Sequence, residues 1–416
     1  MFLTKKSTKV VVFFKLLLAL SVGFSSAFAA NNKAKLNVAE AYEIDSLEHL
    51  LAKIRKEYTP DVRDNYLGYQ IKDGNLIIES TLAKALEVSK KELLMKGYVG
   101  QIETKLLPDA TTLNGFTYAL ANVSVTTNRI GTKNASEVMT QMLLGMPMDV
   151  LTQKSGYCLV RTPDGYLSWV TKGTIKLLTE QQFKEWKSSN RLIYTNLYGR
   201  SYQAPSAGSL PVSDLVQGNI LKITGEEGNY YAVEYPDGRK AFVLKSEAQQ
   251  MSKWMGGEAV KAENILAFGH QLMGTPYLWG GTSVKAMDCS GFTKTCFFNN
   301  GYIVPRDASQ QVHAGDEVDI YENGSTSLKK CLANLKPADL LFFGPNNDKI
   351  THVAFYIGDG KFIHESGMVK INSLKPGTED YDEGHAMDLV KARRFINAKN
   401  NNQIIPISKS NYYTNN

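Results

Sequence analysis

The spacing of hydrophobic residues changes several times along this chain of 416 residues and divides it into distinct segments. Residues 1–29 carry four lysines, then an apolar run, and end in the small-residue sequence Ala27-Phe28-Ala29. This order is typical of a secretory signal peptide, and we expect cleavage after Ala29. The mature protein is therefore predicted to be exported, to the periplasm or the cell exterior, with no membrane contact after cleavage.

Residues 30–115 combine two helical patterns with a short alternating segment. Apolar residues recur at helical spacing over residues 38–58 and again over residues 81–97. Between them the pattern alternates on both sides of Asp73-Gly74, a dipeptide that favours a two-residue hairpin turn. The pattern predicts a small N-terminal α+β domain, and nothing in it indicates a catalytic site.

Two stretches of short alternating strands then repeat with a constant offset of 73 residues. Gly145 aligns with Gly218 in this repeat, and each copy contains a Pro-Asp-Gly turn. Such a pattern predicts two small β-barrels of one type, over residues 116–187 and 188–250. Barrels of this size usually bind or position other groups and rarely catalyse.

The pattern changes again after the repeat, where a helix is predicted to end at Gly274. A loop rich in glycine and aromatic residues follows, and a second helix is predicted to begin at Cys289 and to end near Gly301. A series of strands completes this domain, residues 255–397, so the fold class of the whole chain is α+β. Residues 398–416 are polar and are expected to form a loosely held tail.

Composition and charge exclude some classes of protein. The formal net charge is +6, but the predicted signal peptide contains four lysines and no acidic residue, so removing it lowers the charge by four, to +2. This balance does not indicate a nucleic-acid partner. With 43% hydrophobic and 21% charged residues, the chain is ordinary globular material, and we expect a monomer.

The cysteines are too few for a disulfide scaffold, although one or two bridges are compatible with an oxidising compartment. They are Cys158, Cys289, Cys296 and Cys331. Of these, Cys289 alone has unusual neighbours, because it stands between Asp288 and Ser290 at the predicted start of a helix.

A cysteine thiol becomes a good nucleophile when it loses its proton, and a helix N-terminus or a nearby imidazolium lowers its pKa from about 8.5. Asp288 is a favourable N-cap residue, so Cys289 is predicted to face the free backbone amides of the first helical turn. A carboxylate beside the thiol acts in the opposite direction. Asp288 is therefore expected to point away from the sulfur, either as a simple cap or as a partner for a substrate cation.

The second device that lowers a thiol pKa requires a histidine, and His352 and His364 lie on two predicted strands joined by a Gly-Asp-Gly sequence. A two-residue turn would put the two imidazoles on opposite faces of the hairpin. We predict a three-residue turn that pairs residue 357 with residue 361 and places His364 across from Ala354. His364 is then diagonal to His352, with roughly 7 Å between the Cβ atoms.

These residues have the pattern of a nucleophile, a base and an orienting group. His352 is expected to take the thiol proton of Cys289 and later to give a proton to the leaving amine, while His364 orients His352. The backbone amide of Cys289 and the hydroxyl of Tyr277 are expected to bind the oxyanion. Trp279 belongs to the loop that passes close to the nucleophile, where a packing role is the simpler alternative.

Two other classes of function are less favoured. A wall-binding protein with an inactive catalytic domain would lack one of the three predicted catalytic residues, and all three are present. A zinc hydrolase built on His352, His364, His385 or Cys289 would need a ligand pattern such as H-E-x-x-H, and no carboxylate lies at a ligand-like interval. We therefore expect neither a metal nor a cofactor.

Five short sequences occur in a fixed order between residues 258 and 396: PYLWGG, DCSGF, PRDASQ, DLLFF and HVAFYIGDGKFIH. Together they resemble the NlpC/p60 family of cell-wall cysteine peptidases, whose fold is papain-like. That family commonly has glycine at the position of Ala338, a difference that concerns only a turn. The two repeats resemble bacterial SH3-like domains, although Ser168 replaces a glycine of that pattern and Phe242 replaces a tryptophan.

Members of the family with SH3-like domains ahead of the catalytic domain resemble γ-D-glutamyl-L-diamino acid endopeptidases. These enzymes cut the stem peptide of peptidoglycan (murein) between γ-D-glutamate and the diamino acid. The resemblance implies that Asp288, Ser290, Glu137 and Tyr166 hold the free amino group of an N-terminal L-alanine. An ordinary exposed acid and a turn aromatic are the alternatives for Glu137 and Tyr166.

A physical argument also favours a substrate with a free amine. Carboxylates and a hydroxyl in a covered pocket are costly to desolvate unless a cation pairs with them, so an N-acylated stem should be rejected. Released peptides are then the expected substrate, and hydrolysis of intact peptidoglycan and acyl transfer by the same fold remain the alternatives. Arg306 and Ser309 are expected to line the same cleft, where Arg306 would meet a substrate carboxylate or cap a loop.

Overall fold

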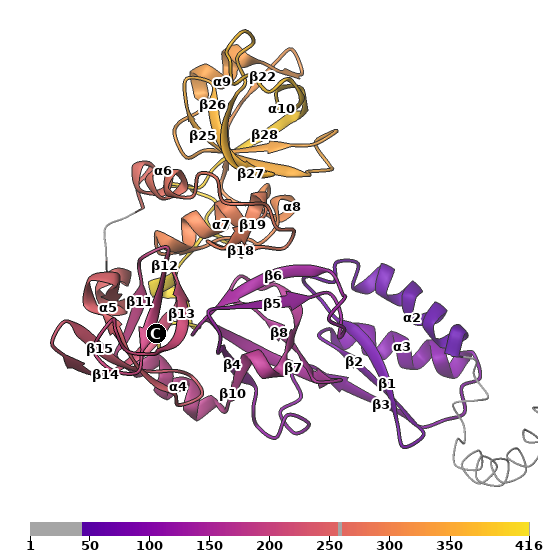
Figure 1. Cartoon of the computed structure of the whole chain (residues 1–416). Helices are drawn as coiled ribbons and strands as arrows, with labels where there is room; N and C mark the ends of the chain where they lie inside the picture. Colours follow the sequence, from indigo (N-terminus) through magenta and orange to yellow (C-terminus); the bar gives the residue numbers. More distant parts are fainter. Residues whose placement is uncertain (1–43, 257–259, 416) are drawn as a thin grey trace, which may run out of the picture. The chain divides into compact units, whose positions relative to one another are not determined.

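The computed structural model describes residues 44–256 and 260–415 (Figure 1). The predicted signal peptide lies outside the described residues. The chain divides into two compact units, residues 1–107 and 108–416. Within the described ranges, no helix is both long enough and apolar enough to cross a lipid bilayer.

The first unit is a three-stranded sheet packed against two helices. Its elements are α2 (Ile44–Tyr58), β1 (Leu67–Lys72), β2 (Asn75–Ser80), α3 (Ala83–Met95) and β3 (Ile102–Leu106). β1 and β2 pair antiparallel, whereas β3 pairs parallel to β2 after the crossover through α3. Asp73 and Gly74 have φ of 50° and 79°, the left-handed values that a two-residue type I′ turn requires. The hairpin predicted at this dipeptide is therefore present.

The first copy of the repeat forms a seven-stranded sheet at the start of the second unit. Its elements are β4 (Tyr118–Ala121), β5 (Val125–Arg129), β6 (Val138–Leu143), β7 (Pro147–Lys154), β8 (Tyr157–Arg161), β9 (Leu167–Thr171), η2 (Lys172–Thr174), β10 (Ile175–Leu178) and α4 (Glu180–Ser188). The strand order is β10-β4-β7-β8-β9-β5-β6, and Met148, Val150 and Val160 are fully buried in its core.

The second copy forms another seven-stranded sheet, with the order β13-β12-β16-β15-β14-β11-β17. Its elements are β11 (Arg191–Tyr194), β12 (Tyr198–Tyr202), β13 (Pro211–Val216), β14 (Ile220–Glu227), β15 (Tyr230–Glu234), β16 (Lys240–Leu244), η3 (Lys245–Glu247), β17 (Ala248–Gln250) and α5 (Met251–Met255). β14 begins at Ile220, 73 residues after β7 begins at Pro147, and the next four elements keep this offset. The repeated sequence therefore folds twice into the same succession of elements.

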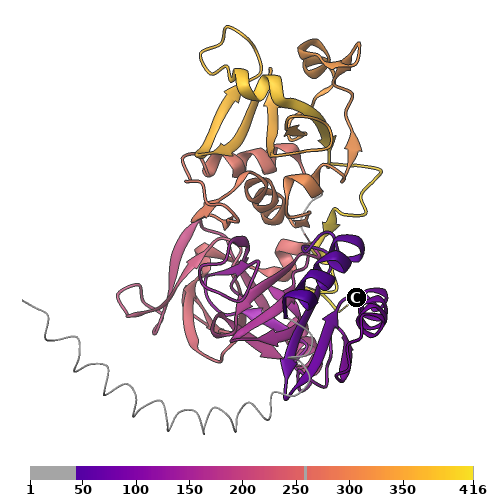
Figure 2. The same ribbon diagram turned by 90° about the vertical axis from the view of Figure 1, so that its right-hand side faces the viewer.

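The rest of the second unit is a six-stranded sheet with helices, and its strand order is β21-β28-β24-β25-β26-β27. Its elements are α6 (Ala262–Gln271), β18 (Thr282–Ser283), β19 (Ala286–Met287), α7 (Cys289–Asn299), β20 (Tyr302–Ile303), α8 (Ala308–Gln311), β21 (Asp316–Glu317), β22 (Tyr321–Glu322), β23 (Ser325–Thr326), α9 (Leu328–Asn334), β24 (Leu340–Phe343), β25 (His352–Gly358), β26 (Lys361–Ser366), β27 (Met368–Ser373), α10 (Glu383–Asp388), β28 (Leu389–Arg394), β29 (Ile405–Pro406) and η4 (Ile407–Lys409). Figures 1 and 2 show this sheet in orange and yellow, with α6 and α7 beside it.

Aromatic packing fixes α7 against the six-stranded sheet. The rings of Phe292 and Phe297 on α7 lie 5.8 and 5.7 Å from the ring of Phe355 on β25, measured between centroids. Phe292, Phe297 and Phe355 are all almost completely buried. Because burial of a phenylalanine side chain contributes about 1.5–3 kcal/mol, these contacts hold the first turn of α7 at a defined place on the sheet.

The C-terminal segment differs from the loosely held tail expected from its polar composition. β29 pairs antiparallel with β20, which follows α7 directly. Ile407 and Tyr413 are buried, and the hydroxyl of Tyr412 donates a hydrogen bond of 2.7 Å to Asp149 on β7. A few apolar and aromatic side chains among many polar ones are enough to anchor the segment, which the average composition did not indicate.

All four cysteines are buried and carry free thiols. The structure thus settles the question of disulfides, which the sequence left open. Cys289 is free to act through its sulfur.

Candidate active site

The first turn of α7 places Cys289 where the sequence predicted it. Asp288 has extended backbone angles and accepts a hydrogen bond of 2.7 Å from the backbone N–H of Gly291, so it is the N-cap and Cys289 is the first helical residue. The side chain of Cys289 is almost buried, since the residue is 8% exposed.

The environment of the thiol differs from the expected one. Burial and, to a lesser extent, the charge of Asp288 raise the pKa of Cys289 to about 12, against the opposing effects of the backbone amides of Val353 and Ser290 and of the charge of Arg306. The backbone amides at the start of α7 act in the predicted direction, but desolvation outweighs them, so the thiol of the free protein keeps its proton. Because the backbone amide of Val353 interacts with the sulfur, Cys289 lies beside the start of β25, where Val353 follows His352.

The hairpin of β25 and β26 has the predicted register for the two histidines but not the predicted turn. His364 pairs with Ala354, as expected, whereas Lys361 pairs with Gly358 instead of residue 357. A β-bulge between Tyr356 and Gly358 supplies the extra residue that we assigned to the turn. Either arrangement pairs His364 with Ala354, and His352 lies two residues before Ala354 on the same strand. Both imidazoles therefore lie on one face of the hairpin.

His352 and His364 are in direct contact. The Nε2 atom of His352 lies 2.8 Å from Nδ1 of His364, and Nε2 of His364 lies 2.9 Å from Oδ1 of Asn372 on β27. The amide nitrogen of Asn372 donates to the carbonyl of Asp380, so its Oδ1 accepts from His364. A neutral His364 must then accept at Nδ1 and His352 must donate from Nε2, which leaves Nδ1 of His352 with a lone pair.

The electrostatics keep both imidazoles neutral. Burial lowers the pKa of His352 well below its usual value, and the neighbouring His364 and His385 lower it further. Burial also lowers the pKa of His364 to about 4, against the opposing effect of its bond to Asn372. A neutral imidazole with a lone pair on Nδ1 is a general base, which is the state that proton removal from a neutral thiol requires. Asn372 was not singled out in the sequence, because only its place on β27, two residues after the Lys370 that pairs with His364, gives it a role.

Arg306 occupies a different place from the expected one. It is 1% exposed, and its guanidinium donates two hydrogen bonds to Asp288, of 2.6 and 3.0 Å, and one of 2.9 Å to Ser290. A further bond of 3.1 Å goes to Thr140 of β6. Its donors are thus used within the protein, and a buried ion pair with Asp288 takes the place of the contact with a substrate carboxylate that we considered.

The first seven-stranded sheet contributes directly to this region. The indole N–H of Trp279, a residue 61% exposed, donates a hydrogen bond of 2.7 Å to the carboxylate of Glu137, which is itself exposed. Tyr166 is buried, and its hydroxyl donates a bond of 3.0 Å to Asp307, the residue after Arg306. Asp307 did not attract attention in the sequence, because its role depends on this contact between distant segments.

The loop before Cys289 fits closely against the same sheet. Gly280 has a φ of 78°, and a Cβ atom there would lie 2.5 Å from the carbonyl oxygen of Val138. Its backbone N–H also donates a bond of 2.9 Å to Asp288. Glycine is therefore required here for both conformation and close approach.

Tyr277 and Ser309, two other predicted site residues, lie on opposite sides of α7 in the sequence. Tyr277 is 38% exposed and is held by a bond from its backbone N–H to the carbonyl of Gly367. Burial raises the pKa of its phenol, and the nearby Cys289, Asp288 and Glu365 add to this effect, so the hydroxyl remains a donor. Ser309 is half-buried on the short helix α8.

Glu365 is a further acidic group that sequence analysis missed. It follows His364 on β26, it is fully buried, and neither carboxylate oxygen has a hydrogen-bond partner among the residues that the structure describes. Burial raises its pKa to about 8, and the charge of Asp288 contributes to the rise. The signal in the sequence was a glutamate two residues after Ile363, on the same face of the strand as that apolar residue.

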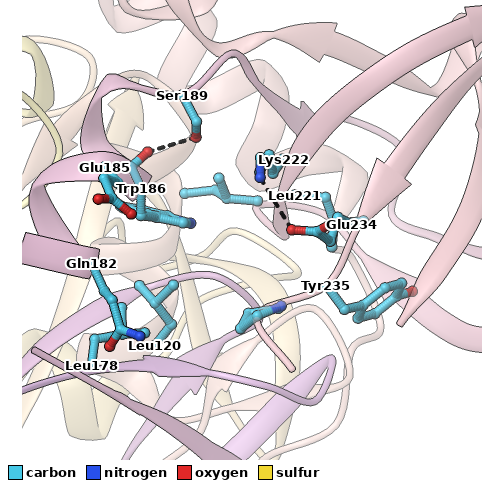
Figure 3. A pocket seen from close by; sticks show the side chains of 12 residues that line it. Leu120, Leu178, Gln182, Glu185, Trp186, Ser189, Leu221, Lys222, Glu234 and Tyr235 are labelled. Carbon is cyan, nitrogen blue, oxygen red and sulfur yellow. Dashed lines mark hydrogen bonds and ion pairs between the residues drawn. The ribbon is translucent and has the colours of Figure 1, made fainter. Parts of the chain in front are cut away.

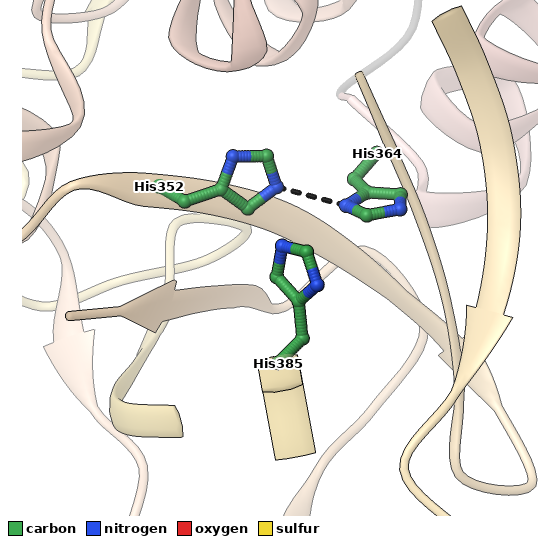
Figure 4. A group of neighbouring side chains, drawn as sticks. All are labelled: His352, His364 and His385. Atoms are coloured by element: carbon green, nitrogen blue, oxygen red, sulfur yellow. Dashed lines mark hydrogen bonds between the residues drawn. The ribbon is translucent and has the colours of Figure 1, made fainter. Parts of the chain in front are cut away.

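His385 is the third imidazole of the cluster. Its ring centroid on α10 lies 4.8 Å from those of both His352 and His364, and its Nδ1 atom lies 2.8 Å from a carboxylate oxygen of Asp382 (Figure 4). From the sequence, His385 was a candidate only as a ligand of a zinc hydrolase.

A separate pocket lies between α4 and the two seven-stranded sheets (Figure 3). Trp186 and Glu185 of α4 line one side, and Lys222 and Glu234, which form an ion pair of 3.1 Å, line another. No cysteine or histidine lines this pocket, so it offers no nucleophile and no general base like those near Cys289.

Comparison with known proteins identifies related sequences and folds. Residues 274–385 match the model of the NlpC/P60 family. The chain is 30% identical over 276 residues to a gamma-D-glutamyl-L-lysine dipeptidyl-peptidase of Bacillus cereus. The aligned region covers 63% of this chain and 77% of the relative. It is also 30% identical over 246 residues to the Bacillus subtilis protein of the same name, covering 57% and 75%. A crystal structure of an NlpC/P60 family protein from Bacillus cereus superimposes with a TM-score of 0.56 and 24% identity, over 67% of this chain and 100% of that one.

Proposed function

The chain belongs to the NlpC/P60 family, and we propose that it is a cysteine peptidase that hydrolyses the γ-D-glutamyl-diamino acid bond of peptidoglycan stem peptides. Peptidoglycan peptides are thus its substrate class. The observation that carries the catalytic proposal is the contact between His352 and His364 on the hairpin whose Val353 amide meets the Cys289 sulfur. The family shares this use of a thiol, and no metal or cofactor takes part in the proposed reaction.

The chemistry follows from the protonation states of the free protein. As the sulfur of Cys289 attacks the γ-carbonyl carbon, its proton moves to Nδ1 of His352, and the carbonyl oxygen becomes an oxyanion. Collapse of this intermediate breaks the C–N bond, and His352 returns its proton to the leaving amine of the diamino acid. Water then attacks the thioester with His352 as base, which releases the γ-D-glutamyl product and restores the thiol.

The oxyanion requires donors that are in place before the reaction. We assign this role to the backbone N–H of Cys289, at the N-terminus of α7, and to the hydroxyl of Tyr277. The phenol suits the role because burial raises its pKa and keeps it protonated. Loss of a single donor of this kind typically costs about 10²–10³ in kcat.

The charge around the site supports selection of a free amine. Three carboxylates, those of Asp288, Asp307 and Glu137, lie at the contact between the first sheet and the loop before Cys289. Two guanidinium groups are bonded there, that of Arg306 to Asp288 and that of Arg129 to the carbonyl of Ser136, so the carboxylates exceed these cations by one formal charge. An ammonium group of an N-terminal L-alanine would reduce this excess, with Glu137 and Tyr166 as its nearest contacts on the first sheet, whereas an acetylated nitrogen would not.

We assign the two repeated sheets to SH3-like domains, the first of which forms one wall of the substrate site. The names of the two Bacillus relatives support release of a dipeptide from the N-terminal end of a short peptide. We further propose that the protein is exported and acts on released peptides as a monomer. Ser309 and Trp279 are assigned to the same cleft.

Product analysis of defined peptides tests this proposal. The purified protein should convert L-Ala-γ-D-Glu-L-Lys, or its diaminopimelate counterpart, into L-Ala-D-Glu and the free diamino acid, as measured by mass spectrometry. The same peptide with an acetylated N-terminus and intact peptidoglycan should be cleaved far more slowly. Equal rates on all three would remove amine selection, and transfer of the acyl group to an added amine without hydrolysis would favour the acyltransferase alternative.

Two variants on the same helix provide the matched control. Cys289→Ala should abolish hydrolysis, because it removes the nucleophile. Cys296→Ala removes a thiol from the buried side of α7, and it should retain the reaction. Hydrolysis that persists in Cys289→Ala would eliminate the thiol mechanism.

A further inference from the structure

Three imidazole rings converge beside the six-stranded sheet of the second unit. One ring nitrogen from each of His352, His364 and His385 lies within 4.8 Å of the others. Nδ1 of His385 is bonded to Asp382, and Figure 4 shows its other ring nitrogen, Nε2, pointing toward the hydrogen bond between His352 and His364. Three residues from β25, β26 and α10, well separated in the sequence, thus direct nitrogen atoms toward one small volume.

Two of these nitrogens already present a lone pair to that volume. His385 donates from Nδ1 to Asp382, so its Nε2 is the acceptor when the ring is neutral. His364 donates from Nε2 to Asn372, so its Nδ1 is the acceptor. An outward ring nitrogen bonded to a carboxylate or carbonyl oxygen is also the arrangement that orients histidine ligands of metal ions.

We propose that His352, His364 and His385 bind a zinc ion and that this binding inhibits the peptidase. Zinc takes imidazole nitrogens at about 2.0–2.1 Å, which in tetrahedral geometry separates two ligand nitrogens by about 3.3 Å. The 2.8 Å bond between His352 and His364 must open slightly, and the nitrogens up to 4.8 Å apart must close, so side-chain adjustments suffice. A water molecule completes the coordination. The inhibitory part of this inference rests on the proposed function.

The surroundings of the cluster suit a bound cation on balance. The carboxylate of Asp382 is one hydrogen bond away from the proposed ion and offsets part of its charge. Lys370, which pairs with His364 across β26 and β27, opposes it. His352 and His385 are only half-buried, so an ion can reach the cluster from solvent.

Inhibition follows from the tautomer of His352. In the metal-free protein its Nε2 carries the proton and its Nδ1 has the lone pair that accepts the thiol proton. Zinc takes the Nε2 lone pair, so the proton of the neutral ring moves to Nδ1, with no net change in the number of protons. Nδ1 is then protonated and cannot accept the proton of Cys289. Zinc at this position therefore removes the base without contacting the nucleophile.

Direct binding is measured first, on a chain without the nucleophile. Equilibrium dialysis of Cys289→Ala against buffered free Zn²⁺ should give one bound ion per chain. The double variant Cys289→Ala/His385→Gln should bind at least about tenfold more weakly, and Asp382→Asn in the same background should lose about 10- to 100-fold. His270→Gln, which removes an exposed histidine of α6, should bind normally. Equal binding with and without His385, or loss of binding in Cys289→Ala itself, would overturn the site.

Inhibition is measured second, as the ratio of each variant's rate with Zn²⁺ to its own rate with a chelator. The wild type should be inhibited and restored by the chelator, whereas His385→Gln should require at least about tenfold more free Zn²⁺. Equal sensitivity of the two proteins would overturn the inhibitory role. A protein with no peptidase activity even with a chelator would refute the proposed function, while the dialysis result would still decide whether the zinc site exists. Circular dichroism establishes that each variant is folded.

Discussion

Trp279 donates its indole N–H to the carboxylate of Glu137 over 2.7 Å, and this bond joins the loop before Cys289 to the first seven-stranded sheet. The two residues are 142 positions apart in the sequence. Both are exposed, so the bond lies at the surface where a peptide can approach. The first seven-stranded sheet thereby places a charged group near the nucleophile Cys289.

Glu137→Gln should weaken selection of free-amine peptides. The variant keeps a hydrogen-bond acceptor for Trp279 but loses the negative charge, so kcat/KM for the free tripeptide should fall roughly 10- to 100-fold, in line with about 1.5–3 kcal/mol for a hydrogen bond to a charged group. The slow reaction with an N-acetylated peptide should change little. Glu185→Gln on α4 is the matched control, since this exposed acid lines the separate pocket. An equal loss on both peptides would show that Glu137 does not recognise the amine.

Several parts of the site could be predicted from the sequence because they depend on local chemistry. The N-cap at Asp288 and the helix start at Cys289 follow from one turn of chain, and the two-residue turn at Asp73-Gly74 follows from a dipeptide. The face shared by His352 and His364 was predicted correctly for a partly wrong reason, since a bulge replaced the longer turn. A three-residue turn and a two-residue turn with a bulge contain the same number of residues between Tyr356 and Phe362, so the sequence did not distinguish them.

Other features depend on contacts between distant segments and were not predictable in the same way. The ion pair between Arg306 and Asp288 requires the loop before α8 to fold against the start of α7. The high pKa of Cys289 arises from burial by the whole domain, which a helix-terminus argument does not include. His385 joins the other histidines because α10 returns to the sheet, 21 residues after His364.

Ala338→Gly should stabilise the protein. Ala338 is buried and has a φ of 69°, a left-handed conformation that costs an L-residue roughly 1–2 kcal/mol. Glycine relieves this strain but loses more entropy on folding, so the net gain should be about 0.5–1 kcal/mol in the free energy of unfolding, measured by urea titration. Ala354→Gly in β25, where the backbone is an ordinary strand, is the control and should destabilise. Equal losses in both variants would show that residue 338 is not strained.

Glu365→Gln should raise stability most at alkaline pH. The folded protein holds the pKa of Glu365 at about 8, above the value of about 4.5 in the unfolded chain, so the folded state binds the additional proton between these values. The stability of the wild type should therefore fall as pH rises from about 4.5 to 8 and then level off. The advantage of Glu365→Gln should grow over this range to roughly 1–3 kcal/mol. Glu263→Gln, an exposed acid on α6, should show no such trend, and a pH-independent difference for Glu365→Gln would contradict the account.

The thiol of Cys289 should react slowly with alkylating agents at neutral pH. Its pKa is raised to about 12, so only a small fraction is thiolate below pH 9 and the rate of iodoacetamide labelling should still be rising there. Peptide mapping measures the rate at Cys289 itself. A plateau reached below pH 7 would indicate a resting thiolate paired with an imidazolium, and neutral His352 could not then be the base.

The most direct measurement is the detection of an acyl group on Cys289 during turnover. A free-amine stem peptide is mixed with the protein, the reaction is quenched in acid within milliseconds to seconds, and the digested protein is examined by mass spectrometry. The account predicts an L-alanyl-γ-D-glutamyl thioester on the peptide that contains Cys289, formed and lost at rates compatible with turnover. Rapid hydrolysis with no acyl group on this cysteine, or with the acyl group on another residue, would contradict it.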